Sequence, residues 1–231
     1  MQYQIFWYHV VPKSTMFLQL IGTVLSLEQI LNAKPLSERG KKILAVAQTL
    51  FLEHGYDNTS LEMIISESGG SRRNIYSEFG NKEKLLLAVI REKAEVQVGT
   101  LLNIDYDLPP QQALSQVCYG FAQGFLSETM VKLFRLVTNI VPKLPEVGEL
   151  IYHFGPLRGS IPLAKYLTHL HQQNILDVDD AEFAAKLLIE MVKGRLHIKT
   201  VLLPSEEISE DEVREHVDKA VARFLKAYKA E

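Results

Sequence analysis

The sequence predicts an all-α fold with two domains, and three observations lead to this prediction. Apolar residues recur at helical spacing from Leu36 onward, whereas the alternation typical of strands is scarce. Capping residues and glycine stops divide the pattern into short N-terminal helices followed by longer ones. The length of 231 residues suits a small domain and a medium one that share a helix. We therefore expect an N-terminal extension (1–36), a three-helix domain (37–82) and a helical domain (83–231).

The composition restricts the possible partners. Hydrophobic residues make up 47% of the chain, which is enough for a packed core, and the net charge of −3 gives no global sign of nucleic-acid binding. Any contact with DNA must therefore come from a local patch. The single cysteine, Cys118, excludes an intramolecular disulfide and a zinc site with several thiolates. It fits a reducing compartment, and we expect a cytoplasmic protein.

The first 36 residues contain two apolar runs, 5–11 and 16–27. Neither reaches the roughly 18 to 20 residues that a membrane-spanning helix needs, so no membrane anchor is expected. An extra arm and a translation start at Met16 or later both fit the extension. A secretion signal is a third alternative, because Lys13 precedes an apolar run that is followed by Asn32 and Ala33.

The helices of the N-terminal domain follow from their caps. The first helix is expected over about 37–54, with Gly55 as its stop. The second is expected to begin at a capping box in which the Thr59 hydroxyl and the Glu62 carboxylate accept backbone amides. The third runs from Ser71 to about Glu78 after a turn over 68–71, and a long amphipathic helix follows over 82–102. The first helix should bury one face, made by Ile43, Leu44, Ala47, Leu50 and Phe51.

The second region begins after the pair Pro109 and Pro110. Helices are expected near 111–127, 129–141, 146–173, 178–202 and 209–229. Pro156 and Pro162 should start, kink or break the 146–173 stretch, since proline lacks the amide that a helix interior needs.

The two short helices joined by 68–71 have the spacing of a helix-turn-helix, whose second helix is sized for the major groove of DNA. In that helix Ile75 and Phe79 share an inward face, so the other side chains point outward. Arginine can bind guanine and asparagine can bind adenine through paired hydrogen bonds, and hydroxyls reach phosphates. Lys82 and Lys84 begin the next helix, where free amides favour an anion. The pattern indicates a local DNA-reading surface.

From Arg39 to Arg91 the sequence resembles the tetracycline-repressor family of regulators, which includes AcrR-type proteins. The spaced matches are Ile43, Leu44, Ala47, Phe51, Gly55, Tyr56, Thr59, Ser60, Ile64, Gly69, Ser71, Ile75, Tyr76, Phe79, Lys82, Glu83 and Leu85. Two positions depart from the family pattern: Ile65 stands where alanine is usual, and Gly70 stands where a small aliphatic residue is usual, which should loosen the turn.

The resemblance implies roles for single residues. It implies that Thr59 and Lys82 contact phosphates, and that the residue matching Tyr76 sets the register on the DNA backbone. Sequence choice would then fall to Arg72, Arg73 and Asn74. The residues expected to face DNA are Ser71, Arg72, Arg73, Asn74, Tyr76 and Ser77.

For the second domain the resemblance implies a ligand-binding and dimerisation body, with an AefR-like type suggested by 134–166. The last two helices would form a four-helix interface, through Phe183, Leu187, Leu188 and Met191 with Val213, Val217, Ala220, Val221, Phe224 and Leu225. Periodicity alone does not distinguish such an interface from the chain's own core. The candidate lining of an effector pocket is Cys118, Tyr119, Phe121, Phe125, Phe134, Tyr152, His153, Phe154 and Tyr166. This lining favours an apolar or aromatic effector.

Metal binding and catalysis have little support in the sequence. His169 and His171, two positions apart on a helix, diverge by about 200° and cannot chelate one ion by themselves. No catalytic or dinucleotide-binding motif is present, so we expect no cofactor and no enzyme.

The favoured interpretation is a homodimeric repressor that a small molecule releases from double-stranded operator DNA. Three alternatives stay open: an activator or nucleoid-like DNA binder, a helical small-molecule-binding protein or enzyme with a vestigial head, and a regulator tethered to a membrane by the first 36 residues.

Overall fold

The computed structural model describes residues 35–157 and 159–230, and its regular secondary structure is helical throughout these ranges. The expectations for the extension lie outside them. The predicted all-α fold class is confirmed. The helices are α3 (Glu38–Asn58), α4 (Leu61–Ser68), α5 (Arg72–Phe79), α6 (Lys82–Gly99), the 3₁₀ turn η2 (Thr100–Leu102), α7 (Pro110–Leu126), α8 (Glu128–Ile140), α9 (Pro145–Tyr152), the π turn η3 (His153–Leu157), α10 (Ile161–Gln172), α11 (Ala181–Leu202) and α12 (Glu210–Ala227).

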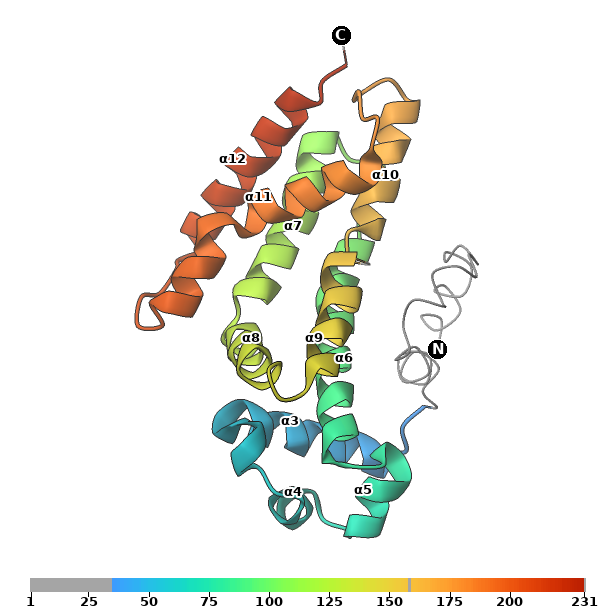
Figure 1. Ribbon diagram of the computed structural model, residues 1–231. Coiled ribbons are helices and arrows are strands. Elements are labelled where there is room, and N and C mark those ends of the chain that lie inside the picture. Colours follow the sequence, from blue (N-terminus) through green and yellow to red (C-terminus); the bar gives the residue numbers. More distant parts are fainter. Residues whose placement is uncertain (1–34, 158, 231) are drawn as a thin grey trace. The chain divides into compact units, whose positions relative to one another are not determined.

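Helices α3, α4 and α5 form a small head (Figure 1). The Ser37 hydroxyl accepts the Gly40 amide and caps α3, and Gly55 breaks this helix at a φ of 79°, where the sequence predicts its stop. The predicted apolar face of α3 is buried, and it meets Ile64 of α4 and Ile75 of α5 in the core of the head. The three short elements are thus held together by one small core.

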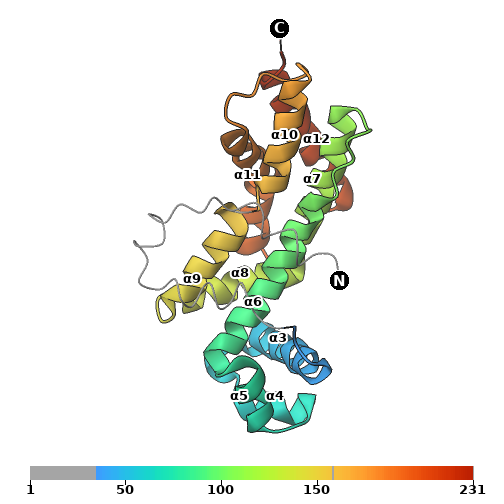
Figure 2. The ribbon, with the colours of Figure 1, turned by 90° about the vertical axis from the view of Figure 1, so that its right-hand side faces the viewer.

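Helix α6 belongs both to the head and to the second domain (Figure 2). Leu85, Leu86, Val89 and Ile90 are buried, and the helix packs against α3 and α5 of the head and against α9 of the second domain. The expected domain boundary at 82/83 therefore falls in the first turn of this shared helix.

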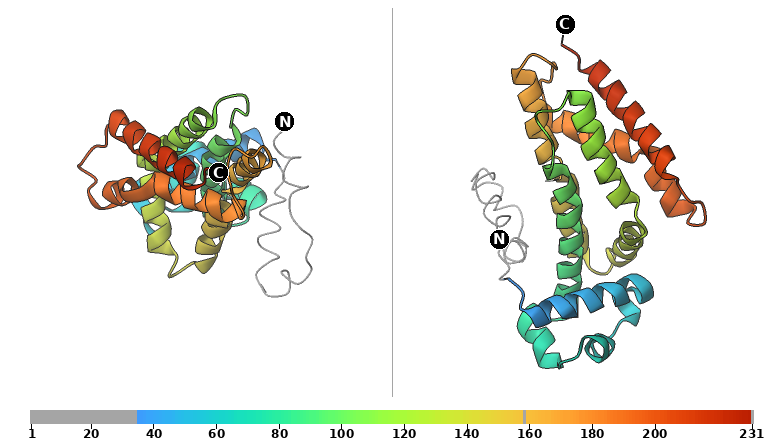
Figure 3. Two further views of the ribbon diagram at one scale, coloured as in Figure 1. Left: turned by 90° about the horizontal axis from the view of Figure 1, so that it is seen from above. Right: turned by 180° about the vertical axis from the view of Figure 1, so that it is seen from behind.

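The second domain has its main core among α7, α10, α11 and α12. Figure 3 shows the ribbon of these helices from above and from behind. Leu114, Leu167, Leu188 and Val217 are buried there. Helix α8 instead packs against α3, and α9 packs against α6. These two helices are therefore the part of the second domain that contacts the head and the base of α6.

The predicted break in the 146–173 stretch is confirmed. Pro156 lies in the π turn η3, and Pro162 lies in the first turn of α10, where a missing amide costs no helical hydrogen bond. The stretch therefore becomes two separate helices, α9 and α10.

Helix α11 is kinked at Gly194, which has a φ of 40° and a ψ of −143°. His216 of α12 fills the inside of the kink, and its Nε2 donates to the Met191 carbonyl at 3.0 Å. A Cβ atom on residue 194 would lie 3.0 Å from that imidazole ring. The kink therefore depends both on a backbone conformation that glycine tolerates and on the space that glycine leaves for His216.

We expect Gly194→Ala to lower the free energy of unfolding by about 1–3 kcal/mol, because the new Cβ adds backbone strain and crowds His216. Gly120→Ala, in regular helix α7 with nothing within 4 Å of the added Cβ, should instead raise it by about 0.5–1 kcal/mol. Urea denaturation of both variants measures the difference. Equal effects would show that the kink places no demand on residue 194.

Candidate DNA-binding interface

Helix α5 has one buried face and one exposed face, as the sequence predicts. Ile75 and Phe79 are buried in the head, whereas Arg73 and Ser77 are exposed and the Tyr76 side chain is 51% exposed. The glycines of the preceding turn, Gly69 and Gly70, both have positive φ. The predicted helix-turn-helix geometry is thus present, with polar side chains on the outer face of its second helix.

The side-chain amide of Asn74, which we expected to be free to bind a base, is instead hydrogen-bonded within the head. Its Oδ1 accepts the Ser71 amide at 2.9 Å and the Ser71 hydroxyl at 3.0 Å, so it caps the start of α5. Paired recognition of adenine needs both the oxygen and the nitrogen of this amide. The expected adenine contact from Asn74 is therefore incompatible with this cap, because the oxygen is already occupied.

The two arginines at the start of α5 lie in different surroundings. Arg72 forms an ion pair with Glu62 of α4, and both side chains are largely exposed. An exposed pair of this kind contributes little, so Arg72 can exchange Glu62 for a nucleic-acid group at small cost. The pair directs Arg72 towards α4, whereas the exposed Arg73 starts about 100° further round the helix.

The predicted capping box of α4 is wrong in its register. Ser60, one residue later than expected, is the N-cap, and its hydroxyl accepts the Met63 amide at 3.1 Å. Thr59 is fully buried, and its hydroxyl lies 2.8 Å from the Gly55 carbonyl and 3.1 Å from the Leu50 carbonyl. The expected phosphate contact of Thr59 is therefore incompatible with its position, since its side chain closes the end of α3.

Ser60 is a candidate phosphate-binding residue that the sequence reasoning missed. It is partly exposed at the start of α4, where the first amides of a helix point at solvent and favour an anion. The adjacent hydroxyl residues at 59 and 60 both fit a cap by spacing alone. Only the burial of Thr59 distinguishes them.

Lys82 lies at the start of α6, beside the head. Its Nζ sits 4.2 Å from the centre of the Tyr56 ring, and Asn81 caps the helix by accepting the Lys84 amide at 2.7 Å. Burial lowers the pKa of Lys82, and nearby Asp57 opposes this shift. Tyr56 thus holds a cation next to the free amides of a helix start, which is an arrangement suited to a phosphate.

A cluster of charged groups joins the head to the second domain at the same place. Lys143, after α8, forms an ion pair with Asp57 at the end of α3. The carboxyl groups of Glu83 on α6 and Glu146 on α9 share a hydrogen bond, and this bond, with burial and mutual repulsion, raises the pKa of Glu83. We call Tyr56, Asp57, Lys143, Glu83 and Glu146 the junction cluster.

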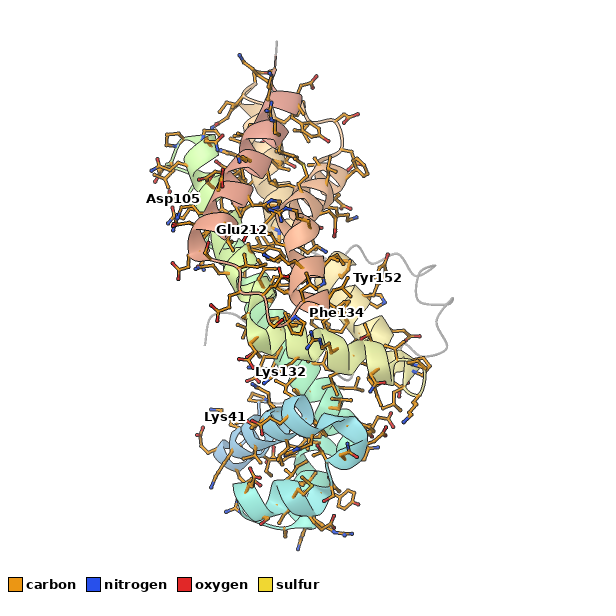
Figure 4. All side chains as sticks on the ribbon, turned by 90° about the vertical axis from the view of Figure 1, so that its left-hand side faces the viewer. Lys41, Asp105, Lys132, Phe134, Tyr152 and Glu212 are labelled. Carbon is orange, nitrogen blue, oxygen red and sulfur yellow. The ribbon has the colours of Figure 1, made fainter. Side chains whose placement is uncertain are left out.

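The candidate pocket residues do not form one group. Cys118, Phe121 and Tyr166 are buried in the main core, and burial raises the pKa of the Cys118 thiol to about 12, so it is no reactive nucleophile. Phe134 on α8 and Tyr152 on α9 are 40% and 57% exposed (Figure 4), so they do not line a closed cavity within this chain. Tyr119, Phe125, His153 and Phe154 lie between these extremes and are partly buried.

One aromatic group does connect three helices of the second domain. Phe125 of α7 stacks on Phe121, and its ring centre lies 4.7 Å from that of His197 on α11. Phe134 of α8 meets the same imidazole edge-on at 4.9 Å. Burial lowers the pKa of His197, and its Nδ1 is buried without a hydrogen-bond partner. The sequence reasoning named the three phenylalanines but not His197.

The histidine pair of α10 has other partners. His169 lies against the ring of Tyr106, 5.0 Å between ring centres, whereas His171 Nδ1 accepts the Val178 amide at 3.2 Å. In the described ranges no three metal-ligating side chains gather into a site. Nor does any helix there have both the length and the apolar character needed to cross a membrane.

The structure separates the two apolar series of the last helices. The series of α12 is turned inward, with Val213, Val217 and Phe224 buried in the main core. On α11, Leu188 is also buried, but Phe183 is 61% exposed and Leu187 is 38% exposed. Only α11 therefore keeps an apolar face outward, which Ile198 and Leu202 extend beyond the kink.

This fold defines a two-domain, all-helical protein with a helix-turn-helix head. Residues 43–89 match the model of the bacterial regulatory proteins of the tetR family, and residues 112–230 match the model of the C-terminal domain of AefR-like transcriptional repressors. The chain belongs to the tetR family. This is a family of transcriptional regulators and not of enzymes.

Single relatives agree with this assignment. The repressor AcnR of Corynebacterium efficiens is 43% identical over 68 residues, which are 29% of this chain and 36% of AcnR. The chain thus spans less than half the length of this and another curated relative that it matches.

Two solved structures resemble this one. A tetR-family regulator of Mesorhizobium loti has a TM-score of 0.76 at 23% identity, covering 84% of this chain and all of that one. The flavonoid-responsive regulator FrrA has a TM-score of 0.67 at 25% identity, covering 83% and 97%.

The junction cluster leads to a pH-dependent prediction. Because the pKa of Glu83 is raised, its hydrogen bond with Glu146 stabilises the fold fully at pH values below the ordinary pKa of a glutamate. This stabilisation is lost as the pH rises through the raised pKa. In Glu146→Gln the amide donates at any pH. The free energy of unfolding of this variant relative to wild type should therefore increase between about pH 4 and about pH 8, by less than about 1 kcal/mol because both groups are partly solvated.

Chemical denaturation at a series of pH values measures this difference. Glu67→Gln, which removes an exposed carboxylate of α4, is the matched control and should show no comparable increase. A constant difference between Glu146→Gln and wild type across the range would contradict the shared proton.

Proposed function

We propose that this protein is a homodimeric transcriptional regulator that binds operator DNA through α5 and is released from it by a small molecule. The observation that supports this most is the outer face of α5: Arg73, Tyr76 and Ser77 are exposed on a helix whose inner face is anchored in the head. Its length of eight residues suits the major groove. AcnR, a relative over the head, is a transcriptional repressor.

Each side chain of this surface has a proposed part. Arg73 and Arg72 are the better candidates for base edges, because a guanidinium can bind guanine through two hydrogen bonds. Tyr76, Ser71 and Ser77 would set the register on the sugar-phosphate backbone. Ser60 at the start of α4 and Lys82 at the start of α6 would hold phosphates on either side.

A dimer is proposed because one head of this size offers few contacts, and two half-sites multiply them. The outward face of α11 is the surface that we assign to it. Phe183, Leu187 and Ile198 are exposed there and would be buried by the same face of a second copy. Burial of an apolar face of this kind supplies the free energy of association.

Release would follow from a population shift. Helix α9 packs against α8 and against α6. An effector that favours one arrangement of α8 and α9 would therefore also bias the position of α6, and hence the position of the head. The aromatic group of Phe125, Phe134 and His197 favours an apolar or aromatic effector. FrrA, which has a similar fold, is flavonoid-responsive, and this supports an aromatic compound. A cytoplasmic location follows from the proposed access to DNA.

The main alternative is a helical small-molecule-binding protein, or an enzyme, with a vestigial head. It is less favoured, because Arg73 and Tyr76 are exposed on the outer face of α5, where DNA can reach them. Binding of DNA decides between the two functions.

We expect wild-type protein to select specific fragments from genomic DNA and to bind them with an affinity that falls steeply as salt rises. Tyr76→Ala combined with Lys82→Ala should weaken binding by at least tenfold, since a register contact and a phosphate contact are lost in each head. Fluorescence anisotropy measures the affinity, and circular dichroism verifies the fold. Lys165→Ala on α10 is a control outside the head. Equal, weak and non-selective binding by wild type and variant would support the alternative.

Effector coupling is tested by reciprocity. If a compound weakens DNA binding by some factor, the selected DNA must weaken binding of that compound by the same factor. A set of planar aromatic compounds that includes a flavonoid is titrated by calorimetry with and without the DNA fragment. A compound that binds with one affinity in both titrations, yet releases DNA, would contradict the mechanism.

A further inference from the structure

Arg39 lies outside the helix-turn-helix in sequence, in the first turn of α3, yet it reaches the turn between α4 and α5. A Cβ atom on Gly70 would lie only 2.7 Å from Arg39 Nη1 and 2.9 Å from Asn74 Oδ1. The guanidinium of Arg39 thus occupies the space next to Gly70 that a side chain would take. Arg39 is itself exposed, so this contact leaves its outer edge open to a ligand.

A second contact holds the start of α3 against α5. The Ser37 hydroxyl donates to the carboxylate of Glu78, near the far end of α5, and the two helices pack against each other. The first turn of α3 therefore lies alongside the second helix of the motif, and this brings Arg39 close to the turn that precedes it. Lys41, two residues later, forms an ion pair with Glu38 instead.

Gly70 is one of the two positions at which this chain departs from the family pattern. We expected it to loosen the turn, but it has a φ of 102°, which favours glycine, and it admits both the Asn74 cap and the Arg39 guanidinium. A residue with a side chain would displace one or both of these groups. Glycine at position 70 therefore allows the Arg39 guanidinium to lie beside the turn.

The charge that Arg39 brings has a consequence for DNA. The start of α5 offers the partial positive charge of a helix terminus together with Arg72 and Arg73, in a chain whose net charge is −3. A third guanidinium next to this terminus strengthens a local positive patch. Arg39 comes from the flanking helix and not from the helix that enters the groove, so the group within its reach is the sugar-phosphate backbone.

We infer that Arg39 is an additional DNA-contacting residue of this protein, which binds a backbone phosphate beside the base pairs read by α5, and that Gly70 makes room for it. This inference rests on the proposed function, because it concerns the same complex with DNA. It adds a contact from outside the motif and assigns a role to the unusual glycine.

The test is a double-mutant cycle on a DNA fragment selected by the wild-type protein. The proteins are wild type, Arg39→Ala, Gly70→Ala, the double variant, and Lys41→Ala as a matched loss of one positive charge from the same turn. Affinities are measured by fluorescence anisotropy at several potassium chloride concentrations. Circular dichroism and urea denaturation verify that each variant is folded.

Arg39→Ala should weaken binding on the order of tenfold per dimer and reduce the slope of log affinity against log salt by about one for each head, as loss of a phosphate contact does. Lys41→Ala should leave the slope unchanged. Because Gly70→Ala already displaces the guanidinium, adding Arg39→Ala to it should have little further effect.

The inference is overturned if Arg39→Ala has the same affinity and slope as Lys41→Ala, or if it changes only the preference for one base pair. It is also overturned if the effects of the Arg39 and Gly70 substitutions simply add. A wild-type protein that selects no fragment would overturn the proposed function itself, and this result is distinct from the other three.

Discussion

The rest of this structure depends on one helix that is buried in two cores. Leu85, Leu86, Val89 and Ile90 of α6 are buried between the head and the second domain, so α6 cannot turn or shift without repacking both. Close-packed interiors do not deform gradually, and they respond to a disturbance by moving between discrete arrangements. A shift of α9 against α6 would therefore be transmitted to the head as a rigid movement. In the proposed mechanism, this is how an effector bound in the second domain changes the presentation of α5.

Charged groups of the junction cluster modify the contact between the head and the second domain. Helix α6 packs against α9, and the Glu146 carboxyl beside Glu83 raises the pKa of Glu83, so ionisation of Glu83 opposes that contact. The ion pair between Lys143 and Asp57 lies across the same boundary and favours it. These partly solvated charges each contribute little to stability. In the proposed mechanism, such small and opposed contributions suit an equilibrium that the binding energy of one ligand shifts.

The outer surface of the head owes its chemistry to how its polar side chains are divided between structure and exposure. Asn74 caps the start of α5 and Thr59 closes the end of α3, which leaves Arg72, Arg73, Tyr76 and Ser77 as the exposed groups of α5. The last two helices also differ in which side chains they expose. Helix α12 buries its apolar residues in the main core, whereas α11 keeps Phe183 and Leu187 exposed. The exposed polar face of α5 and the exposed apolar face of α11 thus each lie on a helix whose other face is buried in a core.

The sequence by itself determined the helices, their stops and the inward face of the head, because periodicity, caps, proline and glycine act through contacts within a few residues. Gly55 and Pro156 interrupt helices where the sequence predicts it, and the predicted apolar face of α3 is buried. Contacts between residues far apart in the chain decided the rest. Burial against Leu50 made Ser60, and not Thr59, the cap of α4. Packing against α7 turned the α12 series inward, and the crossing of α3 over α5 brought Arg39 to Gly70. Local patterns encode which side of a helix is apolar, but only the tertiary structure decides what that side meets.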